Sequence, residues 1–322
     1  MNILITGGLG FIGSNFYNTF KSKYPDYNLV ILDSETYAAD ESNIENHREA
    51  RIIKFSITER ERLFELFENY KFDSVIHFAS ESHVDNSILN PMEFVQTNII
   101  GTLNLLDASI KYGIKLFYHI STDEVFGHLG AVGSFDEKTA YDPRSPYSAS
   151  KASSDHFVRA YYHTYGLPVV ISNCSNNFGP NQHQEKLIPT IIKSILNGKP
   201  IPVYGNGQNV RDWLYVQDHV DAIDMIFHKG KVGETYCIGG RNELNNLRLV
   251  RLICDKIDNI KQWEQNSQDL ITFVEDRKGH DFRYSIDSTK VKEQIGWEPK
   301  VNFDEGLDRT IDFYFKKFGS KE

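Results

Sequence analysis

The stretch NILITGGLGFIG, residues 2–13, combines a short apolar run with closely spaced glycines. We expect residues 2–6 to form a buried strand and the segment after Gly13 to be helical. Glycines between a strand and a helix allow a tight turn, a close backbone approach to a pyrophosphate and close packing of the helix on the strand. The N-terminus of the helix favours the negative charge of phosphate groups. This stretch therefore predicts a dinucleotide-binding unit.

The nature of the dinucleotide is indicated by the next apolar run, residues 29–32, which ends in Asp33. Asp33 follows Gly13 by 20 residues, the spacing at which an acidic residue accepts hydrogen bonds from the adenosine ribose hydroxyls. A carboxylate at this position repels a 2′-phosphate. The sequence therefore predicts NAD rather than NADP as the cofactor.

Apolar runs alternate with helical patterns through the first half of the chain, as in a parallel sheet covered by helices. Strands are predicted over residues 73–79, 115–120 and 167–173, and helices over residues 92–112 and 147–165. The fold class is therefore α/β, with a Rossmann-type doubly wound parallel sheet.

Beyond residue 177 glycines and prolines punctuate shorter elements, which predicts a smaller mixed α/β C-terminal substrate lobe. We place an NAD-binding domain at residues 1–176 and a sugar-nucleotide-binding lobe at residues 177–322. Some segments of the second part are expected to return to the first.

Two polar groups of residues suggest the chemistry. Thr122, Asp123 and Glu124 follow a predicted strand at the carboxyl edge of the sheet, where ligands bind in open α/β folds. Tyr147 and Lys151 lie four residues apart on a predicted helix, so that the ammonium can lower the pKa of the phenol and make it a usable base. Hydride transfer at a carbinol needs only Tyr147 and Lys151. An additional acid and base are the tools of dehydration.

Each pair also has a simpler explanation. The Tyr-x-x-x-Lys spacing arises often by chance in a chain with 17 tyrosines, and an Asp-Glu pair after a strand is commonly a solvated turn or a helix cap. Their position downstream of a dinucleotide fingerprint favours catalysis for both.

Composition narrows the range of partners and compartments. The net charge of −9 argues against non-specific binding of nucleic acid, and no apolar run reaches the roughly 18 residues that a bilayer span requires. The N-terminus carries no basic leader. Three widely spaced cysteines suggest neither a disulfide framework nor a zinc site. We expect a cytoplasmic protein without a metal, in which His83 and His119 are structural.

A phosphate-bearing ligand must then be held by local cations, for which Lys186, Arg211 and Arg277 are the candidates. The guanidinium group offers a planar fork of donors that can bind two phosphate oxygens. For each arginine alone, a surface ion pair is the commoner role.

Motifs along nearly the whole chain resemble the extended short-chain dehydrogenase/reductase family, and within it the dTDP-glucose 4,6-dehydratase branch. The segments that carry this resemblance are residues 7–15, 37–38, 81–85, 121–125, 145–155, 173–177, 185–189, 211–216, 233–236 and 279–281.

The resemblance implies a reaction in which NAD is reduced and restored within one turnover. Tyr147, beside Lys151, would take the proton of the sugar 4-hydroxyl while Thr122 hydrogen-bonds the same oxygen. Glu124 would then remove the C5 proton and Asp123 would protonate the departing 6-hydroxyl. The product would be a 4-keto-6-deoxy sugar nucleotide of the kind that leads to rhamnose and related sugars.

The resemblance and the glycine motif together give two sets of binding residues. The cofactor-binding set is Gly7, Gly10, Phe11, Ile12, Gly13, Asp33, Ile57, Ala79, Ser80, Thr97, Tyr147, Lys151 and Asn177. The substrate-binding set is Ser82, Thr122, Asn176, Lys186, Leu187, Pro202, Tyr204, Arg211, Asn246, Arg277 and His280.

Alternatives share part of this chemistry. A 4,6-dehydratase or 4-epimerase acting on a UDP-, CDP- or GDP-linked hexose would use the same Tyr147 and Lys151, but an epimerase has no need of Asp123 and Glu124. A catalytically silent NAD-binding regulator would be expected to have lost one of these residues. By analogy with relatives, the helices at residues 92–112 and 150–165 are predicted to pair with their symmetry mates in a homodimer.

Overall fold

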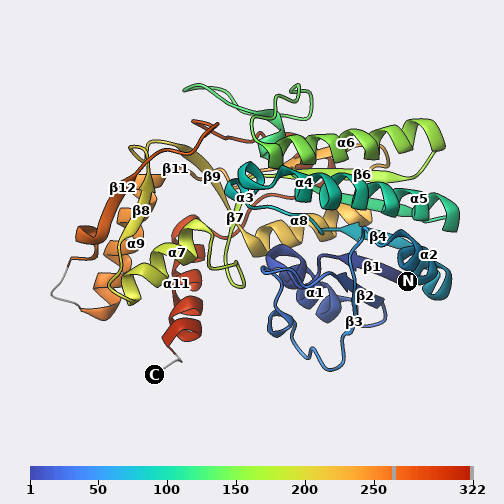
Figure 1. Cartoon of the computed structure of the whole chain (residues 1–322), viewed down its shortest axis with the longest axis horizontal. Coiled ribbons are helices and arrows are strands. Elements are labelled where there is room, and N and C mark those ends of the chain that lie inside the picture. Colours follow the sequence, from blue (N-terminus) through green and yellow to red (C-terminus); the bar gives the residue numbers. More distant parts are fainter. Residues whose placement is uncertain (263–265, 320–322) are drawn as a thin grey trace.

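The computed structural model describes residues 1–262 and 266–319. A seven-stranded, wholly parallel sheet runs through the larger lobe in the order β10-β6-β5-β4-β1-β2-β3 (Figure 1). Its strands are β1 (Asn2–Thr6), β2 (Asn28–Asp33), β3 (Arg51–Lys54), β4 (Ser74–His77), β5 (Leu116–Thr122), β6 (Val169–Cys174) and β10 (Thr235–Ile238). The predicted doubly wound α/β sheet is confirmed.

Helices cover both faces of this sheet, as Figure 1 shows for α1 and α8 below it and α5 and α6 above it. The helices of this lobe are α1 (Phe11–Lys23), α2 (Arg60–Tyr70), α3 (Val84–Leu89), α4 (Pro91–Phe94), α5 (Thr102–Tyr112), α6 (Pro146–Tyr165), α8 (Val216–Lys229) and α10 (Thr289–Ile295). Short 3-10 helices are η1 (Glu41–Asn43) and η3 (Asp123–Phe126) in this lobe and η4 (Ser267–Leu270), which contacts α9 of the second lobe.

Alternating side chains of each strand point to opposite faces of the sheet and belong to two separate apolar cores. In β1, Ile3 and Ile5 pack against α1 and α8 through Phe16 and Ile226, whereas Leu4 belongs to the core formed with α2, α5 and α6. Because both faces of the sheet are covered, its strands are apolar on both sides, and their sequences read as continuous hydrophobic runs.

The predicted helix over residues 92–112 is not a single α-helix. A π-helical segment, η2 (Val95–Gly101), separates α4 from α5. Within it the Asn98 side chain accepts from the backbone N–H of Glu81 at 2.9 Å and donates to its carbonyl at 3.0 Å. π-Helical turns are common where a helix is adapted to a functional site, and this one brings Thr97 to the cavity described below.

The second lobe follows β6 and has its own core. Its strands are β7 (Asn176–Phe178), β8 (Ile201–Tyr204), β9 (Val210–Tyr215), β11 (Glu243–Asn245) and β12 (Ile271–Val274), and its helices are α7 (Leu187–Leu196), α9 (Asn246–Lys261) and α11 (Phe303–Gly319). These strands form a three-stranded and a two-stranded sheet. The chain returns to the larger lobe with α8 and β10, and β10 pairs with β6.

Candidate active site

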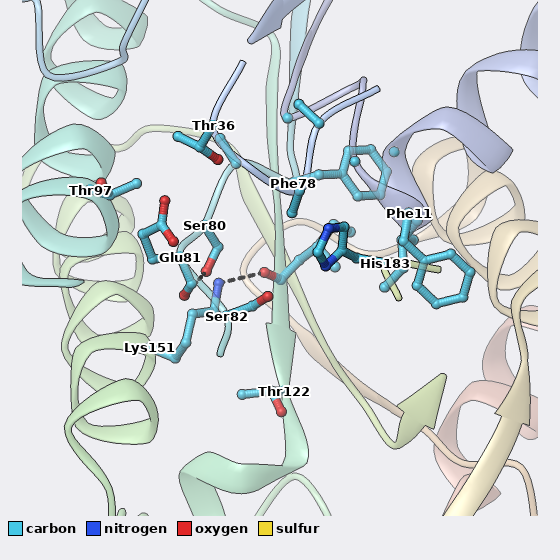
Figure 2. Close-up of a pocket in the computed structure, with 18 of the residues that line it drawn as sticks. Phe11, Thr36, Phe78, Ser80, Glu81, Ser82, Thr97, Thr122, Lys151 and His183 are labelled. Atoms are coloured by element: carbon cyan, nitrogen blue, oxygen red, sulfur yellow. Dashed lines mark hydrogen bonds between the residues drawn. The ribbon is translucent and has the colours of Figure 1, made fainter. Parts of the chain in front are cut away.

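A cavity of about 310 Å³ lies at the carboxyl ends of the central strands. Its wall includes Asp33 at the end of β2, Thr122 at the end of β5 and Cys174 at the end of β6. Residues of the segment before α7, among them His183 and Lys186, complete it from the second lobe. Figure 2 shows Phe11 and Thr97 on opposite sides of this cavity. Ligands of open α/β sheets bind at this edge, where the strand order reverses.

The glycine turn after β1 forms the floor of the cavity and leaves no room for side chains. A Cβ on Gly13 would lie 2.3 Å from the carbonyl oxygen of Gly7, and a Cβ on Gly7 would lie 2.5 Å from the backbone nitrogen of Ala79. Gly7 also has a φ of +70°, which favours glycine. The backbone at the start of α1 is therefore open to a closely packed anionic ligand.

Asp33 closes the adjacent end of the cavity. Its carboxylate accepts from the backbone N–H of Leu9 at 3.0 Å and from that of Glu35 at 2.9 Å. Burial raises the pKa of Asp33, while these two backbone hydrogen bonds oppose the change. The side chain is thus fixed beside the glycine turn, where a ribose bound at the turn would meet it. The residues present fit a dinucleotide.

The acid–base pair is positioned by the end of β5. The strand runs two residues farther than predicted, so Thr122 is its last residue rather than the second residue beyond it. The Thr122 side chain accepts from the Glu124 N–H at 3.2 Å and donates to Asp123 Oδ1 at 3.3 Å, which caps the short helix η3.

The two carboxyl groups differ in their surroundings. Burial raises the pKa of Asp123 well above its ordinary value, and the neighbouring carboxyls of Glu124 and Asp212 raise it further. Burial also raises the pKa of Glu124, but the positive charges of Arg211, Lys186 and Arg277 oppose this. The arrangement therefore favours a protonated Asp123 beside an ionised Glu124, one acid and one base.

Helix α6 brings Tyr147 and Lys151 to the same cavity. Ser145 and Ser148 form a reciprocal capping box and Pro146 occupies the first turn, which fixes the start of the helix one residue before Tyr147. Lys151 Nζ donates to the backbone oxygen of Ile120 in β5 at 2.8 Å (Figure 2).

The phenol of Tyr147 departs from the prediction for its pKa. Burial, together with the nearby Glu124 and Cys174, raises the pKa of Tyr147 well above 10, rather than lowering it. Burial likewise lowers the pKa of Lys151. The helical spacing places both groups in the site as predicted, but the low dielectric and the adjacent carboxyl outweigh the ammonium.

Most of the predicted site residues line this cavity. All of the predicted catalytic and cofactor-binding residues do so, as do Ser82, Asn176 and Lys186 of the substrate set. Residues of the substrate set that do not line it belong to the second lobe: Leu187, Pro202, Tyr204, Arg211, Asn246, Arg277 and His280.

Two of the predicted cations are held across the lobes by the first turn of α3 and the segment before it. Arg277 binds Asp85 with two contacts, Nε to Oδ1 at 2.6 Å and Nη2 to Oδ2 at 3.1 Å. Lys186 Nζ donates to the backbone oxygen of Ser82 at 3.0 Å, and the Tyr204 hydroxyl lies 3.4 Å from Asp85 Oδ2. The third cation, Arg211, stacks on the ring of Tyr284 at 4.3 Å.

Several wall residues were assigned no role from the sequence. These include Ser34, Thr36, Ser56, Phe78, Glu81, Ser175, Gln182, His183 and Glu185. Glu185 accepts from the Tyr37 hydroxyl at 3.0 Å, joining the loop after β2 to the segment before α7. Glu81 and Glu185 could have been predicted from the sequence, because each directly precedes a predicted substrate-binding residue, Ser82 and Lys186 respectively.

The two histidines have structural contacts. His83 Nδ1 accepts from the backbone N–H of Asn86 at the start of α3, and His119 lies 3.1 Å from Asp155 within the core. Among residues 1–262 and 266–319, no group of three or more His, Cys, Asp or Glu side chains is arranged to hold a metal ion. Likewise, in the part of the chain that the structure describes, no helix combines the length and apolarity of a membrane span.

The parallel sheet with its glycine turn, together with Tyr147 and Lys151 on the helix that faces it, defines a protein of the extended short-chain dehydrogenase/reductase class. Within this class, the model of the GDP-mannose 4,6 dehydratase family matches residues 4–310. The chain belongs to this family.

Relatives in this family are similar over their whole length. A probable dTDP-glucose 4,6-dehydratase of Sinorhizobium fredii is 48% identical over 98% of this chain and 93% of the relative. A dTDP-glucose 4,6-dehydratase of Haemophilus influenzae is 46% identical over 98% of both chains. The crystal structure of the dTDP-glucose 4,6-dehydratase DesIV of Streptomyces venezuelae, with NAD bound, superposes with a TM-score of 0.92 at 40% identity and covers 100% of this chain and 99% of its own.

Proposed function

We propose that this protein is an NAD-dependent dehydratase that converts dTDP-glucose to dTDP-4-keto-6-deoxyglucose. The observation that carries the proposal is the convergence, in one cavity, of Tyr147 and Lys151 with the two carboxyls Asp123 and Glu124. The full-length similarity to dTDP-glucose 4,6-dehydratases supports the same assignment.

The glycine turn, Asp33 and the wall residues of the first lobe would hold NAD. Gly7, Gly10 and Gly13 would offer their backbone to the diphosphate, and Asp33 would accept from the adenosine ribose. When bound, NAD supplies the chemistry of accepting a hydride from C4 of the sugar and later returning it to C6.

Tyr147 and Thr122 would act on the 4-hydroxyl. The Tyr147 oxygen would take the hydroxyl proton, and Thr122 would hydrogen-bond the same sugar oxygen. The raised pKa of Tyr147 means that the phenolate must be stabilised at the moment of reaction, and the Lys151 ammonium, one helical turn away, would do so.

Oxidation at C4 acidifies the neighbouring C5 proton, which Glu124 would remove as a base. Asp123, kept protonated by burial and by the adjacent carboxyls, would give its proton to the departing 6-hydroxyl. As the hydride returns to C6, Glu124 would give the proton back to C5. The proton that Tyr147 gains from the 4-hydroxyl balances the one that Asp123 loses with water. The net result is the loss of one water molecule with no change in redox state.

The sugar nucleotide would extend from this site toward the second lobe. Lys186, Arg211 and Arg277 would hold its diphosphate, and all three lie close enough to Glu124 for their charges to lower its pKa. The remaining predicted contacts would be made by Ser82, Asn176, Leu187, Pro202, Tyr204, Asn246 and His280.

The test of this proposal is a substrate panel. The purified protein is incubated with NAD and dTDP-, UDP-, CDP- or GDP-linked hexoses, and the products are analysed by mass for the loss of water. We expect loss of water from dTDP-glucose with little from the other nucleotides. Epimerised product of unchanged mass, or dehydration of another nucleotide sugar alone, would reject the assignment.

The protein is further proposed to be a cytoplasmic homodimer with an NAD-binding domain at residues 1–176 and a substrate lobe at residues 177–322. Large apolar side chains that are exposed along α3, α4, η2 and α6 support the dimer, among them Leu89, Met92, Ile100 and Phe157. The three cysteines are unpaired and buried, as suits a reducing compartment. A monomeric mass by light scattering at micromolar concentration would reject the dimer.

A further inference from the structure

Asp155 is a buried carboxylate that the proposed chemistry does not use. It lies on α6 four residues beyond Lys151 and eight beyond Tyr147, and its side chain is 0% exposed. It is not one of the residues that line the cavity. A charged group so far from water needs compensating contacts, and the residues that make these contacts show which segments Asp155 holds together.

The contacts of Asp155 come from three segments around the active site. One carboxylate oxygen, Oδ2, accepts from the Ser121 hydroxyl at 2.9 Å, the Tyr141 hydroxyl at 2.8 Å and the Asn173 amide at 3.2 Å. The other, Oδ1, lies 3.1 Å from His119 Nε2. Ser121 and His119 belong to β5, Asn173 belongs to β6, and Tyr141 precedes α6.

These contacts keep Asp155 ionised. Burial alone would raise the pKa of Asp155, but the contact with His119, the Lys151 ammonium and the Tyr141 hydroxyl lower it overall. Burial lowers the pKa of His119 to about 4, so His119 is uncharged at neutral pH and its 3.1 Å contact with Asp155 is not an ion pair. The carboxylate in turn opposes the loss of the Lys151 proton.

The same network reaches the catalytic loop. Ser121 directly precedes Thr122, and the Asn173 amide that donates to Asp155 also donates to the backbone oxygen of Thr122 at 3.0 Å. Lys151 is tied to the preceding residue of the strand, Ile120. One carboxylate therefore links the helix that carries Tyr147 to the strand end that carries Asp123 and Glu124.

We propose that Asp155 is a positioning residue for the reaction. By accepting from β5, from β6 and from the segment before α6, it fixes the register between Tyr147 and Lys151 on one side and Thr122, Asp123 and Glu124 on the other. This inference rests on the proposed function. It predicts that loss of the carboxylate impairs the chemical steps and spares substrate binding, because the substrate-binding lobe makes none of these contacts.

The test is the substitution Asp155→Asn, which keeps the shape of the side chain and removes its charge. We expect kcat to fall roughly tenfold to a hundredfold, the loss typical of a small misplacement of catalytic groups, while KM for dTDP-glucose stays within about twofold. The rate at which reduced nicotinamide appears in a single turnover should fall with kcat. A general loss of structure would instead lower the amount of active protein without slowing this step in the folded fraction.

Asp107→Asn is the matched control. Asp107 on α5 accepts a hydrogen bond at 2.5 Å from Tyr161, which lies on α6 like Asp155. It also pairs with Arg60, but it makes no contact of the Asp155 network. It should leave kcat unchanged. Tyr141→Phe, which removes a single donor to Asp155, should lower kcat severalfold and decides the question if Asp155→Asn does not fold.

Wild-type kcat in folded Asp155→Asn, wild-type kcat in Tyr141→Phe, or an equal fall in Asp107→Asn would each overturn the inference. Its failure is separable from failure of the proposed function, because the wild-type protein is assayed first. A wild-type protein inactive on dTDP-glucose rejects the function, whereas an active wild type with an equally active Asp155→Asn variant rejects only the positioning role.

Discussion

The two walls of the active-site cavity are built in different ways. The wall of the first lobe consists of strand ends and a glycine turn whose atoms leave no space: a Cβ on Gly13 would lie only 2.3 Å from the Gly7 carbonyl oxygen. The wall of the second lobe consists of connecting segments that include Lys186, and both Lys186 and Arg277 of the same lobe are held by partners on the opposite lobe. The first wall is fixed by backbone packing and the second by side-chain contacts.

This difference determines how each wall can respond to a ligand. Backbone groups in a sheet and its turn cannot rearrange without breaking the core, so the first wall is preorganised for one shape of ligand. The contact of Arg277 with Asp85 is made of side chains that can exchange partners when a diphosphate offers more charge. We therefore expect substitutions in the first wall to abolish cofactor binding and those in the second to weaken substrate binding by degrees.

Gly13→Ala breaks the first wall and should have the largest effect. The added methyl would meet the carbonyl oxygen of Gly7 and the Cα of Gly8, both backbone atoms that cannot move aside cheaply. We expect a loss of about 1–3 kcal/mol in the free energy of unfolding and NAD binding too weak to detect by calorimetry. Gly130→Ala is the control, because a Cβ there has nothing within 4 Å. Wild-type NAD affinity in Gly13→Ala would contradict the account of the turn.

Arg277→Lys tests the side-chain contacts that hold the second lobe and should have a smaller effect. A lysine keeps the charge but loses the planar fork that binds Asp85 in the free protein and would bind two phosphate oxygens. We expect KM for dTDP-glucose to rise roughly tenfold with kcat within about twofold, measured by initial rates. Arg251→Lys, on the exposed side of α9, should change neither. A fall in kcat without a change in KM would place Arg277 in the chemistry instead.

The pH dependence of the reaction tests the same difference between the two lobes, and its expected effect is the smallest of the three. Burial raises the pKa of Glu124, and the second-lobe cations oppose this. Because the base must be ionised, elimination should slow as the pH falls through this raised pKa, at a higher pH than for an ordinary carboxyl. Lys186→Met removes one opposing charge, so the acidic limb of the kcat profile should move to higher pH, with a few-fold lower rate at its acidic end. If the acidic limb of the kcat profile did not move, the charge of Lys186 would have no influence on the pKa of Glu124.

The first wall was predicted from the sequence far better than the second. The glycine spacing, Asp33 and the Tyr147–Lys151 pair are short-range patterns, and the covered parallel sheet is read from continuous apolar runs. The Asp85–Arg277 contact joins residues far apart in the chain, and no local pattern encodes it. The raised pKa of Tyr147 was missed for a similar reason, since it depends on burial and on Glu124 from another element.

The central claim is that one cavity carries out oxidation with Tyr147 and elimination with Glu124 as separable steps. The most direct measurement is a single turnover of Glu124→Gln with NAD and dTDP-glucose, following the absorbance of reduced nicotinamide and the mass of the sugar nucleotide, with Tyr147→Phe alongside. We predict that reduced nicotinamide accumulates in Glu124→Gln without loss of water, and that it barely forms in Tyr147→Phe, as a roughly hundredfold to ten-thousandfold loss of general-base catalysis requires. Dehydrated product formed by Glu124→Gln at the wild-type rate, or normal C4 oxidation by Tyr147→Phe, would contradict the account.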